Sequence, residues 1–222
     1  MEEYVVRIIS AEPVTHDVKR FRVEKPQGYH FIPGQATELS INQEQWRKEL
    51  RPFTFTSLKD KDYLEFTIKI YNNHDGVTQQ LSQLNVGDEL LIHDVWGAIQ
   101  YKGEGVFIAG GAGITPFIAI FRELESTGKL GNNKLICSNK TEQDIILKSE
   151  FEQMLGNNFI NTLTREKTGK YDHRKIDKAY LREKIEDFHQ HFYICGPDAM
   201  VQDIQHILKE LGASDDVVTV EV

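Results

Sequence analysis

The stretch Val106-Phe107-Ile108-Ala109-Gly110-Gly111-Ala112-Gly113-Ile114-Thr115-Pro116 decides the fold of this chain. Its first four residues form an unbroken apolar run, which is typical of a β-strand covered on both faces. The glycines then predict a tight turn, and residues 114–124 have the periodicity of an α-helix with Pro116 in its first turn. A buried strand that turns at once into a helix indicates a parallel α/β sheet.

The alternation of strands and helices continues to the end of the chain. Strand-like runs recur at residues 134–137, 159–164, 192–195 and 217–222, with helical segments between them at residues 143–154, 177–185 and 198–211. We therefore predict a parallel sheet covered on both faces, with ligands bound beyond the carboxyl ends of its strands. Glycines at such an edge let a backbone approach a pyrophosphate, although this turn lacks the third glycine of the usual dinucleotide fingerprint.

The first hundred residues follow a different pattern. Short runs of alternating polar and apolar residues predict strands at residues 4–9, 18–23, 36–41, 51–57, 63–70 and 89–93, and residues 77–84 predict one helix. Several short strands at this spacing favour an antiparallel β-barrel or sandwich. Because the pattern changes near residues 102–105, we expect one domain over residues 1–102 and a second over residues 103–222.

Within the first half, Arg51-Pro52-Phe53-Thr54-Phe55-Thr56-Ser57 places a cation, a ring and a hydroxyl within four positions. In an extended chain Arg51 and Phe53 share one face, and Thr54 points to the other. A guanidinium that grips phosphate, a ring that stacks and a hydroxyl that hydrogen-bonds are the parts of a flavin nucleotide cradle. Edge strands without a ligand also carry Arg and Phe, so the motif gains weight only from agreement elsewhere.

A third segment, Tyr193-Ile194-Cys195-Gly196-Pro197-Asp198-Ala199-Met200, ends another predicted strand and enters a helix. Its position is again the ligand-binding edge of a parallel sheet. Two interpretations of Cys195 stand side by side: a small buried apolar residue, which is common for reduced cysteine, and a functional thiol at a strand end.

Charge and cysteine content exclude several classes of protein. The 222 residues include 26 basic and 34 acidic side chains, and the net charge of −8 argues against non-specific binding of nucleic acid or anionic membranes. Neither a secretory signal nor a bilayer-spanning run is visible, so we expect a cytoplasmic protein without membrane insertion. Two cysteines cannot hold an iron–sulfur cluster, which needs four ligands, and His189 with His191 lacks a third metal ligand.

Together the three segments, in this order and spacing, resemble the ferredoxin–NADP reductase superfamily over essentially the whole chain. Each motif is weak alone, whereas the ordered set RPFT, Gly-Val-Thr, GGAGITP and CGP is specific. The resemblance implies an N-terminal flavin-binding antiparallel β-barrel followed by a C-terminal α/β domain that binds NAD(P). It further implies FAD as cofactor and NADPH or NADH as co-substrate.

On the flavin side, the resemblance implies a role for each matching residue. Arg51 matches the arginine that pairs with the flavin pyrophosphate, and Phe53 matches an aromatic residue, usually tyrosine, that packs on the isoalloxazine ring. Thr54 matches the hydroxyl residue that approaches flavin N5. The remaining matches are a strand whose backbone contacts the flavin and a helix start that binds its pyrophosphate: Ile68, Lys69, Ile70, Gly76, Val77 and Thr78.

On the nicotinamide side, the resemblance implies a dinucleotide turn, a catalytic segment and a ribose site. Cys195 matches the cysteine near nicotinamide C4, and Glu221 matches a C-terminal glutamate that stabilises charge near the reacting ring. Many members end with one further aromatic residue, which this chain lacks, so we expect a more open flavin face. The matching binding residues are Gly111, Gly113, Thr115 and Pro116 in the turn, Gly196 and Pro197 after the cysteine, and Thr164 and Arg165 near the adenosine ribose.

The implied function is electron transfer from NAD(P)H, by hydride transfer to flavin N5, to a separate carrier such as ferredoxin or flavodoxin. Two alternatives remain open: a flavin reductase that uses diffusible flavin, and an electron-transfer subunit of a larger complex. A docking patch for an acidic carrier is one interpretation of the basic residues of the first half, and scattered surface charge is the other: Arg20, Arg22, Lys25, Arg47 and Lys48. The choice between NADH and NADPH and the oligomeric state are left open.

Overall fold

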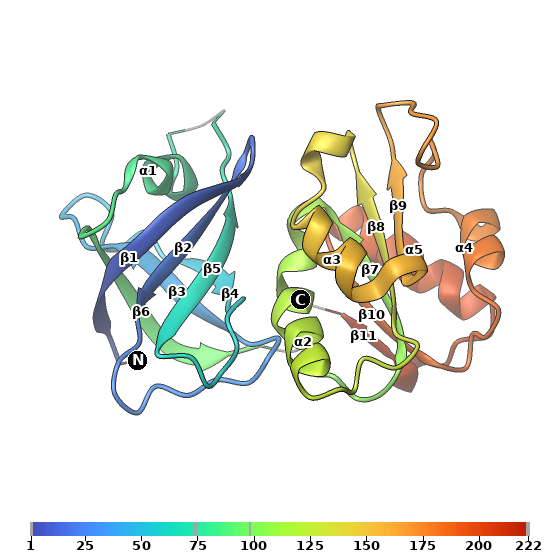
Figure 1. The fold of residues 1–222 in the computed structure, drawn as a ribbon, viewed down its shortest axis with the longest axis horizontal. Coiled ribbons are helices and arrows are strands. Elements are labelled where there is room, and N and C mark those ends of the chain that lie inside the picture. The colour runs from blue at the N-terminus through green and yellow to red at the C-terminus, as the bar shows by residue number, and fades with distance from the viewer. Residues whose placement is uncertain (1, 73–74, 98, 221–222) are drawn as a thin grey trace. The chain divides into compact units, whose positions relative to one another are not determined.

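The structure is a computed structural model that describes residues 2–72, 75–97 and 99–220 (Figure 1). The chain divides into two compact units. The first unit comprises residues 1–100 together with residues 115–123, and the second comprises residues 101–114 together with residues 124–222.

The first unit is built on a six-stranded antiparallel sheet in the order β4-β3-β6-β1-β2-β5 (Figure 1). Its strands are β1 (Tyr4–Thr15), β2 (Val18–Glu24), β3 (Ala36–Ile41), β4 (Arg51–Thr54), β5 (Tyr63–Lys69) and β6 (Glu89–Trp96). An antiparallel bridge between Phe55 and Phe66 joins the two end strands, so the sheet closes into a barrel. Alternating apolar side chains fill its interior, and Val77 and Leu81 of helix α1 (Val77–Gln83) pack on the same core.

Three predicted strands of the first unit differ by several residues from the observed ones, and the simplest case is the strand predicted over residues 89–93, which continues to Trp96. The first strand extends to Thr15 instead of ending at residue 9, because β1 pairs with β6 in its first part and with β2 in its second. The strand predicted over residues 51–57 changes partner. Residues 51–54 pair with β3, whereas Phe55 bridges to β5 and the Thr56 N–H donates to the Glu65 carbonyl at 2.7 Å. This change of partner is the corner at which the barrel closes.

The second unit is built on a five-stranded parallel sheet in the order β11-β10-β7-β8-β9. The strands are β7 (Gly105–Gly110), β8 (Lys134–Asn139), β9 (Phe159–Leu163), β10 (His191–Cys195) and β11 (Val218–Val220). These strands are rich in apolar residues because the sheet is covered, and every residue of β7 is buried. The other helices are α2 (Thr115–Ser126), α3 (Lys148–Leu155), α4 (Lys178–Lys184) and α5 (Asp198–Glu210), with short 3₁₀ turns η1 (Gly111–Ile114), η2 (Glu142–Asp144), η3 (Gly156–Asn158) and η4 (Asp215–Val217).

The predicted fold class is confirmed: an antiparallel β-barrel is followed by an α/β unit with a parallel sheet. One predicted helix, over residues 143–154, begins five residues late. Thr141 and Asp144 form a capping box around the turn η2, and Leu147 adopts a left-handed conformation (φ 51°) just before α3 begins. Ile145 and Ile146 are buried in between, so the apolar residues that suggested a helix serve the core from an irregular segment.

Candidate functional site

The predicted flavin motif lies on β4, where exposure falls steadily along the strand instead of alternating as predicted. Phe53 packs against the barrel core, Thr54 is 8% exposed, and Arg51 is exposed. The Arg51 guanidinium donates to the Leu50 carbonyl at 2.6 Å and lies 3.4 Å from the Glu49 carboxylate. This ion pair is solvent-exposed and therefore weak, so the guanidinium fits the phosphate-binding role that the motif predicts.

The start of helix α1 fits an anion. Its N-cap, Gly76, has no side chain to accept from the first N–H groups, and the first turn contains no acidic residue. Val77 is buried in the core, while the Thr78 hydroxyl accepts a hydrogen bond from the Tyr71 N–H at 3.3 Å. Val77 and Thr78 therefore fix the helix start to the barrel, while the first N–H groups of the helix suit a phosphate.

The third predicted flavin segment is the end of β5. The side chains of Ile68 and Ile70 are buried, and Lys69 forms a 2.7 Å ion pair with Asp17. These side chains are therefore occupied, which leaves the backbone as the group that could contact a ligand. Among the described residues, the edge of β5 away from β2 has a strand partner only at Phe66. The backbone groups beyond Phe66 thus fit the predicted backbone role.

In the second unit, the structure brings the Gly-rich turn and the cysteine segment into direct contact. A Cβ atom added to Gly113 would lie 2.3 Å from the Cys195 carbonyl oxygen and 2.7 Å from the Gly196 Cα. Only glycine allows this approach. Gly111 has a different reason to be glycine, because it adopts φ 53° at a point with open space beside it. Two segments separated by about eighty residues therefore form one continuous backbone surface at the carboxyl edge.

Helix starts converge at this surface. The turn η1 and helix α2 follow β7 directly, with Thr115 and Pro116 as the first residues of α2, and α5 begins after Pro197. Pro197 also packs against Gly110, since a Cβ there would lie 2.8 Å from its Cδ. Helix N-termini beside glycines provide N–H groups and partial positive charge. These helix starts suit a dinucleotide pyrophosphate, although Asp198 adds a carboxylate to the first turn of α5. Cys195 ends β10 and is 9% exposed, at the edge of the same surface.

The predicted ribose residues directly follow β9 and hydrogen-bond to the end of the neighbouring strand β8. The Thr164 N–H and hydroxyl both donate to the Asn139 carbonyl, at 2.9 and 3.2 Å, and the Arg165 N–H donates to the Lys140 carbonyl at 2.9 Å. Arg165 and Lys140 are exposed, so two cations flank the carboxyl edge of β8 and β9. Glu142 lies beside them and pairs with Lys148. The predicted Glu221 lies outside the described residues.

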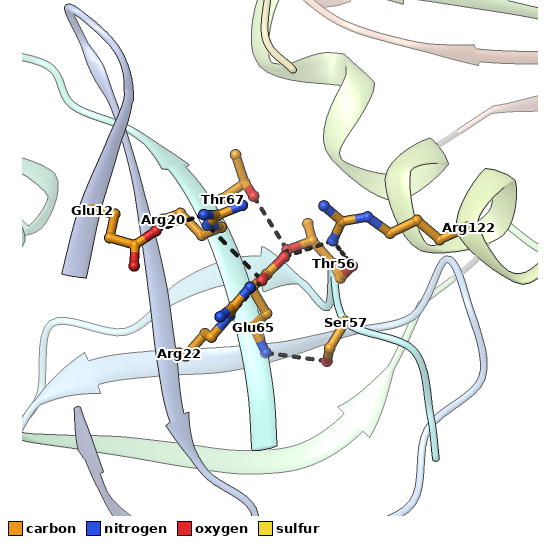
Figure 2. Close-up of polar contacts among 8 residues, drawn as sticks. All are labelled: Glu12, Arg20, Arg22, Thr56, Ser57, Glu65, Thr67 and Arg122. Atoms are coloured by element: carbon orange, nitrogen blue, oxygen red, sulfur yellow. Dashed lines mark hydrogen bonds and ion pairs between the residues drawn. The ribbon is translucent and has the colours of Figure 1, made fainter. Parts of the chain in front are cut away.

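Sequence reasoning missed one polar cluster, around Glu65 of β5. This carboxylate is 1% exposed, and Arg122 of α2 contacts it at 2.6 Å and Arg22 at 3.0 Å (Figure 2). The only sequence signal is a charged residue between Leu64 and Phe66, where strand alternation would allow either face. Burial opposes ionisation, but the charge of Arg122 and hydrogen bonds from Arg122, Arg22 and Thr56 outweigh it, so the pKa of Glu65 lies below its ordinary value.

Comparison with known proteins gives a domain family for each half of the chain. The oxidoreductase FAD-binding domain model matches residues 5–101, and the oxidoreductase NAD-binding domain model matches residues 107–206. NADH-cytochrome b5 reductase 2 of Danio rerio is 28% identical over 90% of this chain and 78% of its own length. NADH-cytochrome b5 reductase 1 of Homo sapiens is 28% identical over 96% of this chain and 83% of its own.

Solved structures agree in fold. A ferredoxin NADP+ reductase from Neisseria gonorrhoeae with bound FAD and NADP matches with a TM-score of 0.86 at 19% identity, covering 100% of this chain and 98% of that one. The CS-b5R domains of human Ncb5or, in the NAD+ form, match with a TM-score of 0.87 at 25% identity, over 100% and 70% of the two chains.

The chain belongs to the ferredoxin–NADP reductase superfamily. It is a flavin-dependent NAD(P)H oxidoreductase, with FAD as cofactor and a nicotinamide dinucleotide as co-substrate. Within the described residues, no helix combines the length and apolar character needed to cross a bilayer.

Proposed function

We propose that this protein passes electrons from NADH or NADPH, through bound FAD, to a separate small electron-carrier protein. The observation that carries the proposal is the single backbone surface formed by Gly113, Cys195 and Gly196 at the carboxyl edge of the parallel sheet. A surface that only glycines allow, beside two helix starts, supports dinucleotide binding next to a strand-end thiol.

The division of labour follows from the residues. Bound FAD would accept a hydride and release electrons singly or in pairs, and the protein would supply position and electrostatics. We assign Arg51 and the α1 start to the flavin pyrophosphate, Phe53 to packing on the flavin ring, and Thr54 to hydrogen bonding at flavin N5. Gly111 and Gly113 hold the dinucleotide pyrophosphate. Cys195 orients the nicotinamide, because hydride transfer needs reacting atoms within about 3–3.5 Å.

For the acceptor, a haem carrier of the cytochrome b5 kind ranks ahead of ferredoxin and flavodoxin. The support is that the relatives named above are NADH-cytochrome b5 reductases. The basic residues of the first half give ferredoxin docking little support, since Arg20 contacts Glu12 at 2.5 Å, Arg47 contacts Glu3 at 2.5 Å, and the Lys25 ammonium donates to two backbone carbonyls. These three cations already have partners within the barrel unit, which leaves less positive charge for an acidic carrier.

A comparison of acceptors tests the proposal. The FAD-loaded protein is supplied with NADH or NADPH without oxygen and offered cytochrome b5, a ferredoxin, a flavodoxin or free FMN. We expect one protein carrier to be reduced with saturation at low carrier concentration while FAD stays bound through gel filtration. Reduction of free FMN alone, with loss of the bound flavin, would instead identify a flavin reductase.

We further propose that the adenosine ribose lies between Arg165 and Lys140. Two exposed cations suit a 2′-phosphate, whereas the nearby Glu142 disfavours one. Replacing Arg165 by Ala should therefore raise the KM for NADPH more than the KM for NADH. Lys167→Ala, an exposed basic residue two positions later, serves as control. Equal changes in both KM values would remove Arg165 from the ribose site.

A further inference from the structure

The buried Glu65 carboxylate on β5 contacts three other segments of the chain. Its Oε1 accepts hydrogen bonds from the Arg122 guanidinium at 2.6 Å and from the Thr56 hydroxyl at 3.0 Å, and its Oε2 accepts from Arg22 at 3.0 Å (Figure 2). Arg20 lies 4.0 Å from the same Oε2. The carboxylate therefore has a partner on β2, on α2 and after β4.

Glu65 also contacts the segment after β4 through its backbone N–H and carbonyl groups. The Thr56 N–H donates to the Glu65 carbonyl at 2.7 Å, and the Glu65 N–H donates to the Ser57 hydroxyl at 3.1 Å. Arg122 also donates to the Thr56 carbonyl at 2.7 Å. Arg122 thus donates hydrogen bonds both to the Glu65 carboxylate and to the backbone of the segment that begins directly after Thr54. All of these residues belong to the first compact unit.

Because Arg122 is part of α2, its contacts also restrain the rest of that helix. The helix begins at Thr115, directly after η1, so Arg122 lies seven residues, about two turns, from the first residue of the helix. An α-helix of this length is stiff, and its two ends move together. Fixing Arg122 against Thr56 therefore fixes Thr115 and Pro116 relative to the strand that ends at Thr54.

We propose that Glu65 and Arg122 are positioning residues for hydride transfer: they hold the start of α2 in register with the flavin strand. The inference rests on the proposed roles of Thr54 and the dinucleotide turn. Its physical basis is that a misplacement of about 1 Å can slow such a reaction by about 10²-fold.

The choice of an ion pair supports positioning over simple stabilisation. Apolar residues of similar volume often stabilise a core as well as a buried ion pair does, because the pair loses its hydration. Hydrogen bonds, unlike apolar contacts, impose direction. The Nη1 of Arg122 donates to both the Glu65 carboxylate and the Thr56 carbonyl, so these two directional bonds define the register between α2 and the segment after β4.

The test compares Arg122→Met, Arg122→Lys and Glu65→Gln with a matched control. The control is Glu123→Gln, which removes the neighbouring α2 contact to the barrel, a 2.6 Å pair with Lys59 that is largely exposed. Each protein is loaded with FAD. Flavin reduction at saturating nucleotide is measured by stopped flow, and reoxidation by ferricyanide is measured separately because it needs no nucleotide.

We expect Arg122→Met to retain FAD and normal ferricyanide reoxidation but to reduce its flavin at least about ten-fold more slowly. Arg122→Lys should recover part of the rate, and Glu123→Gln should match the unmodified protein. Glu65→Gln should slow reduction similarly, with the double variant no slower than the slower single one, because both act through one contact.

Normal reduction rates in Arg122→Met and Glu65→Gln would overturn the inference. So would equal losses of reduction and reoxidation, which would indicate a general structural role. If Arg122→Met does not fold, Arg122→Lys and Glu65→Gln decide the matter by the same readouts. Failure of the unmodified, FAD-loaded protein to be reduced by either nucleotide is a different result: it would refute the proposed function, and this inference with it.

Discussion

Cys195 lies in a row of three residues that pair across the parallel sheet. It pairs with Ala109 on β7, which in turn pairs with Cys137 on β8. The two thiols share a register but differ in surroundings. Cys137 is 2% exposed and burial raises its pKa, whereas Cys195 ends its strand against the Gly-rich turn. Position at the strand end, and not residue type, is therefore the reason why we propose Cys195 and not Cys137 for the catalytic role.

Replacement of each cysteine by alanine tests this assignment. Cys195→Ala should slow reduction of bound flavin by about ten-fold or more, because nicotinamide orientation is lost, while FAD content stays unchanged. Cys137→Ala is the control and should leave the rate unaltered. The measurement is single-turnover flavin reduction, and an unchanged rate in Cys195→Ala would remove the thiol from the reaction.

Arg51 carries the predicted charge contact to the flavin pyrophosphate. A hydrogen bond to a charged group contributes about 1.5–3 kcal/mol, so Arg51→Ala should weaken FAD binding by about 10–100-fold. Lys48→Ala, an exposed basic residue on the preceding segment, is the control. The measurement is a fluorescence titration of the flavin-free protein with FAD, and wild-type affinity in Arg51→Ala would contradict the assigned role.

At the scale of elements, the Gly-rich turn depends on the absence of a side chain. Gly113→Ala would put a Cβ 2.3 Å from a backbone oxygen of Cys195, so the turn or β10 must shift. We expect a lower melting temperature and loss of nucleotide-dependent flavin reduction. Gly169→Ala, at a position with open space and no left-handed backbone, should change neither. Normal reduction in Gly113→Ala would show that the contact does not matter.

Much of this architecture could be predicted from the sequence, for a physical reason. The period of apolar residues reports which faces are buried, and this predicted an antiparallel barrel or sandwich, the parallel sheet and helix α1 within a residue. The same signal failed at residues 143–147. There Ile145 and Ile146 are buried without forming a helix, because the tertiary core and not local periodicity determines their conformation.

The candidate site divides in the same way. The Gly-rich turn and the cysteine segment are recognisable in the sequence because each has glycines at the end of an apolar run. Their mutual contact could not be predicted, because it depends on the pairing of β7 with β10. The Glu65 cluster could not be predicted, because its members come from four segments of the chain: Arg22, Thr56, Glu65 and Arg122. A lone charge within an apolar strand does not reveal its partner.

At the scale of the whole molecule, Glu65 predicts how stability depends on pH. Its folded-state pKa is depressed, so its contribution is present above the unfolded pKa of about 4.3 and is lost as pH falls through the lower folded value. Removing one partner of a buried ion pair costs about 3–5 kcal/mol. Glu65→Gln should therefore lower the free energy of unfolding by about that amount at pH 7.

The difference between the unmodified protein and Glu65→Gln should shrink as the pH falls below the unfolded pKa of about 4.3 and should be lost below the lower folded pKa of Glu65. Glu12, which pairs with Arg20 nearby, titrates in both proteins, but the charge of Glu65 raises its pKa, so its contribution cancels only in part. Urea unfolding at several pH values measures the difference. A gap that stays constant down to pH 2 would show that the ionised carboxylate is not the source of the stability.

The central claim is that a nicotinamide dinucleotide delivers hydride to FAD bound by this chain. The most direct measurement is anaerobic stopped-flow mixing of the FAD-loaded protein with NADH or NADPH, each unlabelled or deuterated at nicotinamide C4. The account predicts loss of the oxidised flavin absorbance within one turnover, more slowly with deuterium. Flavin that stays oxidised with both nucleotides would contradict it.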